Sequence, residues 1–147
     1  MTTVRLELVP DAALVRLARL VAVSVARLNG LHEDTVEDIR LAVGEACGRA
    51  VAVHLRHGVA KTIQLSFTDG PGLTASIVDR VRQPPASGSE AVRLLRAGPG
   101  RPPGAGDVLG PDGAPAVLAL LEGLADRLDI STGAAGTCVE MRWDADD

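Results

Sequence analysis

The chain has 147 residues, the size of one domain, so we expect a single domain over residues 1–147. A net charge of −4, one phenylalanine, one tryptophan and no basic run argue against direct nucleic-acid binding. The chain lacks the ~18-residue apolar run of a membrane helix and the N-terminal pattern of a signal peptide, so we expect a cytoplasmic protein. Cys47 and Cys138 are expected to be reduced thiols, and the Ala, Arg, Gly and Val bias suggests a GC-rich bacterial genome.

The first elements follow from apolar periodicity and capping residues. Val4 to Leu8 alternates apolar and polar residues, which predicts a half-buried strand. Asp11 is a suitable N-cap for a helix that runs to Leu28, and Asn29-Gly30 ends it. This helix is expected to turn one apolar stripe inward, formed by Leu14, Leu17, Val21 and Val25.

A second helix is expected from about Asp34 to His57, capped by Asp34 or Thr35 and ended by Gly58. Lys61 to Thr68 and Leu73 to Asp79 both alternate, and the turn between them is rich in glycine. These two segments therefore predict a β-hairpin. His54 and His57, near the helix end, are read as residues that favour the helix dipole rather than as metal ligands.

Residues 83 to 115 hold seven glycines and seven prolines, with one short apolar patch from Ala91 to Leu95. We interpret this stretch as a lid without helix or strand. Regular structure then resumes with a helix over residues 116 to 128, strands over 129 to 132 and 137 to 143, and an acidic tail over 144 to 147. The helix is expected to bury Val117, Leu120, Leu121 and Leu124.

The predicted order is β-α-α-β-β, lid, α-β-β. Strands come in consecutive hairpins and helices in two groups. This order favours an α/β (α+β) two-layer sandwich, in which a mixed, mostly antiparallel sheet is covered on one face by helices.

The stretch DIRLAVGEACGRAVAVH, residues 38 to 54, raises a specific question. Gly44 and Gly48 each cost about 1 kcal/mol relative to alanine inside a helix and lie four residues apart. Their presence indicates close approach of another element, a ligand or a partner on this face. Glu45 and Arg49 are also four apart, so they can meet on one helix surface.

Four segments carry a resemblance to a known family. VEDIRLAVGEACGRAV is similar to a helix that ends in Glu-Ala-x-x-Asn-Ala, with Arg49 in place of the asparagine. SIVDRVRQPP is similar to an Asp-x-Gly-x-Gly segment in which Asp79 is kept and both glycines are replaced, by Val81 and Gln83. GAPAVLALLEGLADRLDI follows the lid but lacks its Gly-x-Gly opening, and GAAGTCVEMRW keeps the Gly136-Thr137 pair of the closing strand. Together they resemble the GHKL (histidine-kinase-like, Bergerat) ATPase superfamily, and within it the small bacterial anti-sigma factors that are serine protein kinases.

The resemblance implies roles for the matching positions. Glu45 would be a relic general base, Asp79 would bind the adenine amino group, and Gly136 and Thr137 would complete the nucleotide site. The missing asparagine is the family's Mg²⁺ ligand, and Arg49 offers a cation no lone pair. We therefore expect no efficient kinase, no metal site and no cofactor, with ATP and Mg²⁺ only if the site is retained.

The sequence is compatible with three interpretations of Arg49. The first is an exposed ion pair with Glu45, worth only ~0.3–0.5 kcal/mol. In the second, Arg49 fills the vacated Mg²⁺ position and pairs with the former catalytic carboxylate. In the third, Arg49 contacts nucleotide phosphate directly.

The resemblance implies a regulator of transcription. We predict an anti-sigma-like pseudokinase that binds a sigma factor, an anti-anti-sigma (STAS-type) protein, or both. Arg16 or Arg19 of the first helix is the expected contact residue, and a homodimer is possible by resemblance. The alternatives are an active Mg-ATP-dependent serine protein kinase that phosphorylates an anti-anti-sigma factor, and a nucleotide sensor without turnover.

Overall fold

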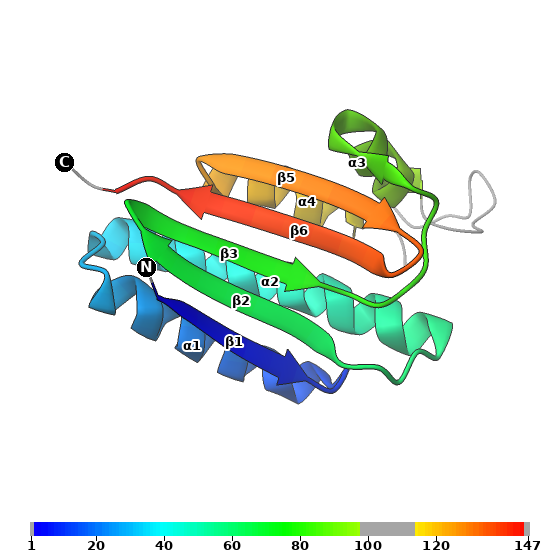
Figure 1. The fold of residues 1–147 in the computed structure, drawn as a ribbon, viewed down its shortest axis with the longest axis horizontal. Coiled ribbons are helices and arrows are strands. Elements are labelled where there is room, and N and C mark those ends of the chain that lie inside the picture. The colour runs from blue at the N-terminus through cyan, green and yellow to red at the C-terminus, as the bar shows by residue number, and fades with distance from the viewer. Residues whose placement is uncertain (1, 98–113, 146–147) are drawn as a thin grey trace.

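The computed structural model describes residues 2–97 and 114–145, and these form one sheet with helices on one face (Figure 1). The strand order is β1-β2-β3-β6-β5-β4, and every neighbouring pair is antiparallel. The predicted two-layer sandwich with a mostly antiparallel sheet is confirmed. The elements, in chain order, are β1 (Thr3–Leu8), a 3-10 turn (Ala12–Leu14), α1 (Val15–Leu28), α2 (Glu33–His57), β2 (Ile63–Gly70), β3 (Gly72–Val78), β4 (Ala86–Ser87), α3 (Gly88–Ala97), α4 (Ala114–Leu124), β5 (Arg127–Gly133) and β6 (Gly136–Trp143).

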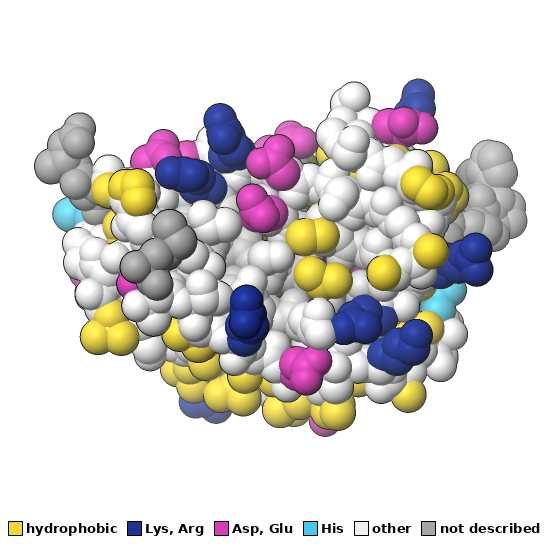
Figure 2. Space-filling view, in the orientation of Figure 1, with side chains coloured by type: hydrophobic (Ala, Val, Ile, Leu, Met, Phe, Trp, Pro, Cys, Tyr) yellow, Lys and Arg dark blue, Asp and Glu magenta, His cyan; other side chains and the backbone are white. Residues whose placement is uncertain are grey.

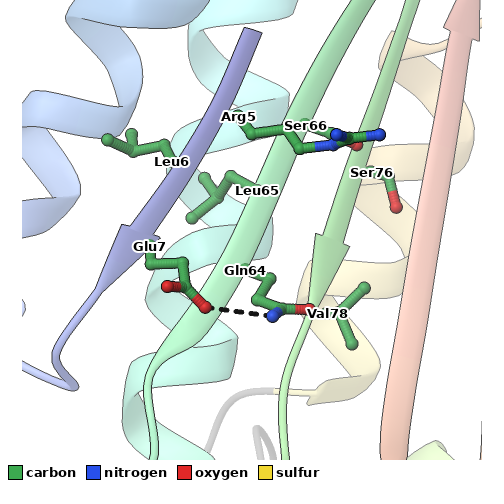
Figure 3. Close-up of a pocket in the computed structure, with 8 residues that line it drawn as sticks. All are labelled: Arg5, Leu6, Glu7, Gln64, Leu65, Ser66, Ser76 and Val78. Atoms are coloured by element: carbon green, nitrogen blue, oxygen red, sulfur yellow. Dashed lines mark hydrogen bonds between the residues drawn. The ribbon is translucent and has the colours of Figure 1, made fainter. Parts of the chain in front are cut away.

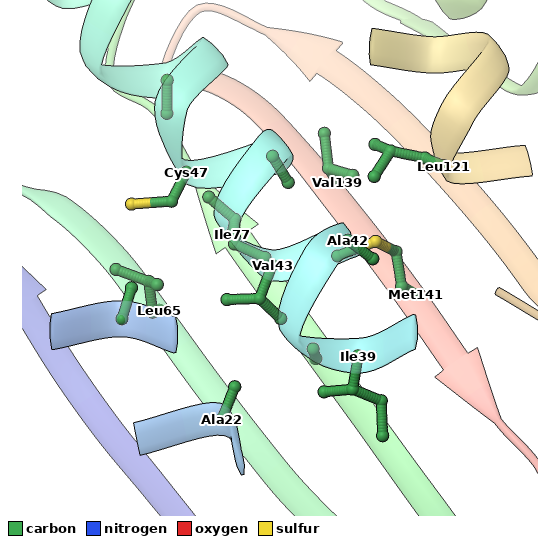
Figure 4. Close-up of a cluster of buried hydrophobic side chains, with 14 of the residues drawn as sticks. Ala22, Ile39, Ala42, Val43, Cys47, Leu65, Ile77, Leu121, Val139 and Met141 are labelled. Carbon is green, nitrogen blue, oxygen red and sulfur yellow. The ribbon is translucent and has the colours of Figure 1, made fainter. Parts of the chain in front are cut away.

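The core lies between the sheet and α2, which runs behind the central strands (Figure 1). Alternate residues of the strands face the helices, as the period of two requires, and these include Ile63, Leu65 and Phe67 of β2 and Val139, Met141 and Trp143 of β6. Figure 4 shows Ile39 and Val43 of α2 among Leu65, Ile77 and Met141 of the strands. Complete burial of one such aliphatic side chain stabilises the fold by roughly 1.5–3 kcal/mol.

The predicted inward stripe of α1 is only partly confirmed. Leu14, Val21 and Val25 are half-buried and pack against the core, whereas Leu17 is 42 % exposed. The fully buried residues of the helix are Val15, Ala18, Ala22 and Ala26, which the stripe did not include. Small side chains on the buried face let α1 approach α2 closely, and this close packing favours the alanine face over the larger leucines.

Several boundaries also differ from the predictions. α2 begins at Glu33, one residue earlier than expected, because the Nδ1 of His32 accepts from the N–H of Asp34 (3.1 Å) and His32 caps the helix in place of Asp34 or Thr35. Gly58 ends it in the left-handed conformation, as predicted. α4 ends at Leu124 and β5 is seven residues long, so the predicted helix was too long. Leu120, expected inside, is 41 % exposed.

The expected lid is partly regular structure. Ala86–Ser87 pairs with β5, and α3 occupies Gly88–Ala97, so the prediction of no helix or strand is wrong over these residues. The apolar patch explains the difference, because Ala91 and Leu95 are buried and anchor α3 on the core. The remainder of the expected lid, from 98 to 113, lies outside the described residues.

Over residues 2–97 and 114–145, no helix combines the length and the apolar character that crossing a membrane requires.

Candidate functional site

A buried polar cluster forms where β3 ends beside the start of β6 and the middle of α2. Asp79 follows β3 directly, and its backbone N–H donates to the carbonyl of Thr137 (3.0 Å). This bond continues the β3–β6 ladder by one residue. Arg49 reaches the same point from α2, so the fold brings together three positions that the sequence separates by 30 and 58 residues.

The carboxylate of Asp79 is engaged on both oxygens. Oδ2 accepts from Nη1 of Arg49 at 2.8 Å, and both side chains are at least 98 % buried. Oδ1 accepts from the backbone N–H of Val81 (3.0 Å) and of Thr137 (3.3 Å). An ion pair this deeply buried depends on such additional hydrogen bonds, because each charge has lost its hydration. The arrangement stabilises the strand ends as a unit.

The expected contact between Arg49 and Glu45 is not found, so the first two interpretations of Arg49 are wrong as stated. Arg49 faces the strand ends and is buried, whereas Glu45, one turn earlier, is exposed. A buried guanidinium requires a buried anion, and Asp79 supplies it. Arg49 therefore pairs with Asp79, the carboxylate expected to bind adenine, and not with Glu45, the expected general base.

Two buried atoms beside the ion pair have no hydrogen-bond partner among the described residues, Nε of Arg49 and Oγ1 of Thr137. The cluster thus leaves one N–H donor and one hydroxyl unsatisfied. Both carboxylate oxygens are already in use.

Gly136 permits the close approach of β6 to the end of β3. A Cβ built at this position would lie 1.8 Å from the carbonyl oxygen of Asp79, and φ of Gly136 is +132°. Only glycine accommodates both conditions.

Val81 and Gln83 stand at the two positions where the resembled family has glycines. Both residues are buried, and the N–H of Gln83 donates to the Gly133 carbonyl (3.0 Å).

His54 also belongs to this region, although its position near the helix end predicted only a favourable interaction with the helix dipole. It is completely buried. Its Nε2 accepts from the N–H of Arg80 at 2.9 Å, and its Nδ1 lies 3.1 Å from the carbonyl of Val59. These bonds require a neutral imidazole with its proton on Nδ1. His54 therefore ties the last turn of α2 to the residue after Asp79, a link that only the fold could show.

The two glycines of α2 have different surroundings. A Cβ on Gly44 would lie 2.9 Å from Cδ of Arg19, so Gly44 makes room for the aliphatic stem of that arginine. A Cβ on Gly48 would meet nothing within 4 Å among the described residues, so close approach is found at Gly44 alone. Arg19 is consequently half-buried on α2, whereas Arg16 is exposed.

Both cysteines are free thiols. Burial raises the pKa of the Cys47 thiol to about 11, although the nearby Arg19 charge acts in the opposite direction. Across the described residues, no group of three or more histidine, cysteine and acidic side chains could hold a metal ion.

A hollow of about 560 Å³ lies on the open face of the sheet, away from the helices (Figure 3). Arg5 and Glu7 of β1 line it, together with Gln64 and Ser66 of β2 and Ser76 of β3. It shares no lining residue with the Asp79 cluster, and its walls are side chains of a twisted, solvent-facing sheet. It is not the site that the motifs predict.

Comparison with known proteins identifies a family to which the chain belongs and a solved structure with a similar fold. A family model described as a histidine kinase-like ATPase domain matches residues 8–143. The solved structure of the RsbU and RsbW domains of Rv1364c from Mycobacterium tuberculosis is similar, with a TM-score of 0.66 and 18 % identity. The match covers 98 % of this chain and 32 % of that chain, so the chain spans about a third of its length. A search of the curated proteins finds no match.

Proposed function

Because the chain belongs to the histidine kinase-like ATPase domain family, we propose that it is a partner-switching regulator whose nucleotide site is closed from within. In this proposal it acts as an anti-sigma-like pseudokinase, binding a sigma factor, a STAS-type anti-anti-sigma protein, or both. The observation that carries the proposal is the buried ion pair between Arg49 and Asp79. The whole-chain likeness to a structure that contains an RsbW domain supports the same class of regulator.

The residues present do not fit Mg·ATP. The carboxylate expected to accept from the adenine amino group already accepts from Arg49 and from two backbone N–H groups. The position expected to ligate Mg²⁺ carries a guanidinium, which has no lone pair and repels a cation. A nucleotide would have to break a buried ion pair before it could use Asp79, and that would leave a buried charge unpaired.

Thermal unfolding tests whether the site is closed. The midpoint would be measured with and without millimolar ATP or ADP, each with Mg²⁺ and with EDTA. A ligand at one hundred times its Kd stabilises the folded state by ~2.7 kcal/mol, a shift of several degrees, and we expect no shift. A Mg²⁺-dependent shift of the unaltered chain would overturn the closed-site proposal.

Partner binding is proposed for the arginine-bearing side of α1. Arg16 is exposed and free to meet an acidic surface, whereas the stem of Arg19 is held against Gly44. Sigma factors and STAS-domain proteins would be tested for binding to the immobilised chain. We expect Arg16→Glu to weaken binding more than Arg19→Ala, while Arg56→Glu, an exposed arginine of α2, leaves it unchanged.

Kinase activity would be tested on the same STAS-domain proteins. The proposal predicts no phosphate transfer to a partner serine. Transfer that is lost in Glu45→Ala would replace the pseudokinase with an active serine kinase, since Glu45 is exposed and accessible to a substrate hydroxyl.

A further inference from the structure

Three segments of the chain meet at the end of the sheet where β3 finishes. The imidazole of His54 joins two of them, because its Nε2 accepts from the N–H of Arg80 (2.9 Å) and its Nδ1 lies 3.1 Å from the carbonyl of Val59. The N–H of Gln83 donates to the carbonyl of Gly133 in the β5–β6 hairpin (3.0 Å), which adds the third segment. The last turn of α2, the connection to β2 and the residues after β3 are therefore neighbours at this end of the molecule.

The residues that meet here are basic, although the chain as a whole has a net charge of −4. Residues 46–68 and 80–89 contain no aspartate or glutamate. Asp79, which lies between the two stretches, is buried and paired with Arg49. The same stretches supply His57, Lys61, Arg80 and Arg82, and we call these four residues the basic end. The fold thus concentrates positive charge at one end of an acidic protein.

The backbone after β3 turns its arginines outward. Val81 and Gln83 are buried, whereas Arg82 is exposed and Arg80 is half-buried. The N–H of Val81 donates to Oδ1 of Asp79 (3.0 Å), and the N–H of Gln83 is bound to the hairpin, so Arg82 projects from a segment that is held on both sides. Figure 2 shows Lys and Arg side chains beside a histidine at the right-hand end of the visible face, where Figure 1 places the last turn of α2.

The four side chains of the basic end are available to a partner. Within residues 2–97 and 114–145, none of them forms an ion pair or a side-chain hydrogen bond. Glu7 approaches the connection beside Lys61, but its carboxylate accepts from Gln64 (3.0 Å) and Thr62 (3.4 Å). Surface arginines elsewhere do have carboxylate partners, as in the pairs Arg27–Glu33, Arg40–Glu37 and Arg142–Asp144. The basic end therefore presents an unbalanced positive charge to solvent.

Arg56 lies outside the basic end, although it belongs to the same turn of α2. It follows His54 by two residues, which corresponds to about 200° around the helix, so the two side chains leave opposite sides. His57 follows His54 by three residues and shares its side. Arg56 is exposed like Arg82, so it offers a control of the same chemistry.

A hollow of about 330 Å³ adjoins Arg82. Its lining consists of Arg82, Gln83, Pro84, Pro85 and Ala134. The two proline rings and the alanine methyl give the hollow an apolar wall beside the guanidinium. A partner can bury an apolar side chain there while its carboxylates pair with the neighbouring cations. An apolar centre with a charged rim is typical of protein interfaces.

We propose that the basic end binds an acidic segment of a protein partner. Carboxylates of that segment pair with Lys61 and Arg82, and an apolar side chain beside them enters the hollow. Arginine suits this role because its guanidinium binds a carboxylate with two parallel hydrogen bonds. A nucleic acid or an anionic membrane is a poorer match, because a net charge of −4 repels an extended polyanion. This inference does not depend on the proposed function, which places partner binding on α1.

Fluorescence anisotropy of a labelled Glu-Asp-Leu-Glu-Asp peptide with the full chain at low salt tests the charge pairing. Lys61→Gln and Arg82→Gln should each weaken binding at least about threefold, and the double variant at least about tenfold. Arg56→Gln should stay within about twofold of the unaltered chain. All three residues are exposed, so the variants should fold. The uncharged Gln-Asn-Leu-Gln-Asn peptide should not bind, and glycine in place of leucine should weaken binding several-fold.

Backbone amide signals in NMR spectra locate the bound peptide. The signals of Lys61 and Arg82 should shift on peptide addition, whereas that of Arg127, an exposed residue at the far end of β5, should not. Absence of binding at millimolar peptide, or an equal loss in Arg56→Gln, would overturn the proposal. Tighter binding of a single-stranded oligonucleotide or of anionic vesicles would overturn it in favour of another class of partner. Self-association that Arg82→Gln abolishes would overturn it in favour of a second copy.

Discussion

Glu45 and Asp79, the two carboxylates that the motifs single out, lie in opposite environments. Asp79 is buried, accepts three hydrogen bonds from protein donors and pairs with Arg49. Glu45 is exposed on α2, and the described residues give it no hydrogen bond or ion pair. A carboxylate such as Asp79, whose two oxygens both accept hydrogen bonds from the protein, supports the fold. An exposed carboxylate such as Glu45 is available for chemistry or recognition. The difference separates a carboxylate whose two oxygens both accept hydrogen bonds within the fold from one that faces solvent.

The largest effect is expected where the Asp79 region is most tightly packed. Gly136→Ala places a Cβ against the Asp79 carbonyl and imposes an unfavourable backbone conformation, so it should destabilise the fold by more than ~4 kcal/mol. Urea unfolding followed by circular dichroism measures this. Gly123→Ala is the matched control, because open space surrounds that α4 position and alanine should gain up to about 1 kcal/mol there. Equal stability of the two variants would contradict the packing described here.

The second largest effect on stability is expected when the buried guanidinium of Arg49 is removed. Arg49→Met leaves the Asp79 charge unpaired and should lower the free energy of unfolding by about 3–5 kcal/mol. Arg27→Met provides the exposed comparison, since Arg27 pairs with Glu33 in solvent and should lose less than about 1 kcal/mol. The double variant Arg49→Met/Asp79→Asn should lose less than the sum of the single variants, because neither charge remains. Additive losses would show that the two side chains do not interact.

The buried thiol of Cys47 on α2 also predicts that the stability of the fold depends on pH. The folded-state pKa of Cys47 is raised to about 11 from an ordinary value near 9.0, so the unfolded thiol loses its proton first. The contribution of the Cys47 thiol to the free energy of unfolding is fully present below pH ~9. It falls by roughly 1.4 kcal/mol per pH unit as the pH rises toward 11. The chain holds no tyrosine, which removes one common source of alkaline titration. Urea midpoints from pH 8 to 10.5 should decline in the unaltered chain and in Cys138→Ala, but less steeply in Cys47→Ala.

The smallest effect is expected at Glu45. Glu45→Gln should change the free energy of unfolding by less than about 0.5 kcal/mol, because an exposed side chain without a partner contributes little. The same urea titration measures it. A loss above about 1.5 kcal/mol would mean that Glu45 has a structural partner, and the contrast with Asp79 would disappear.

The sequence predicted much of the fold because periodic patterns report local structure directly. The β2–β3 hairpin, the closing strand β6 and the Gly58 helix end are all confirmed. The errors arose where packing outweighed pattern. α1 buries alanines in place of its larger leucines, and α3 forms in a glycine- and proline-rich stretch because Ala91 and Leu95 reach the core.

For the candidate site, motif resemblance identified Arg49, Asp79, Gly136 and Thr137, and the fold brings all four together. The partner of Arg49 was predicted incorrectly, since spacing along a helix reveals only neighbours on the same helix. His54 was missed for the same reason: its hydrogen bonds reach Val59 and Arg80, which the folded chain alone places beside it.

The sequence by itself determined the element types, the order of the layers and the loss of the expected metal ligand, because residue chemistry and periodicity are local properties. Tertiary structure decided which charges meet, which leucines stay outside and which basic side chains stay unpaired. Those outcomes depend on distances between segments far apart in the chain, and burial changes the energy of each contact according to what the fold places next to it.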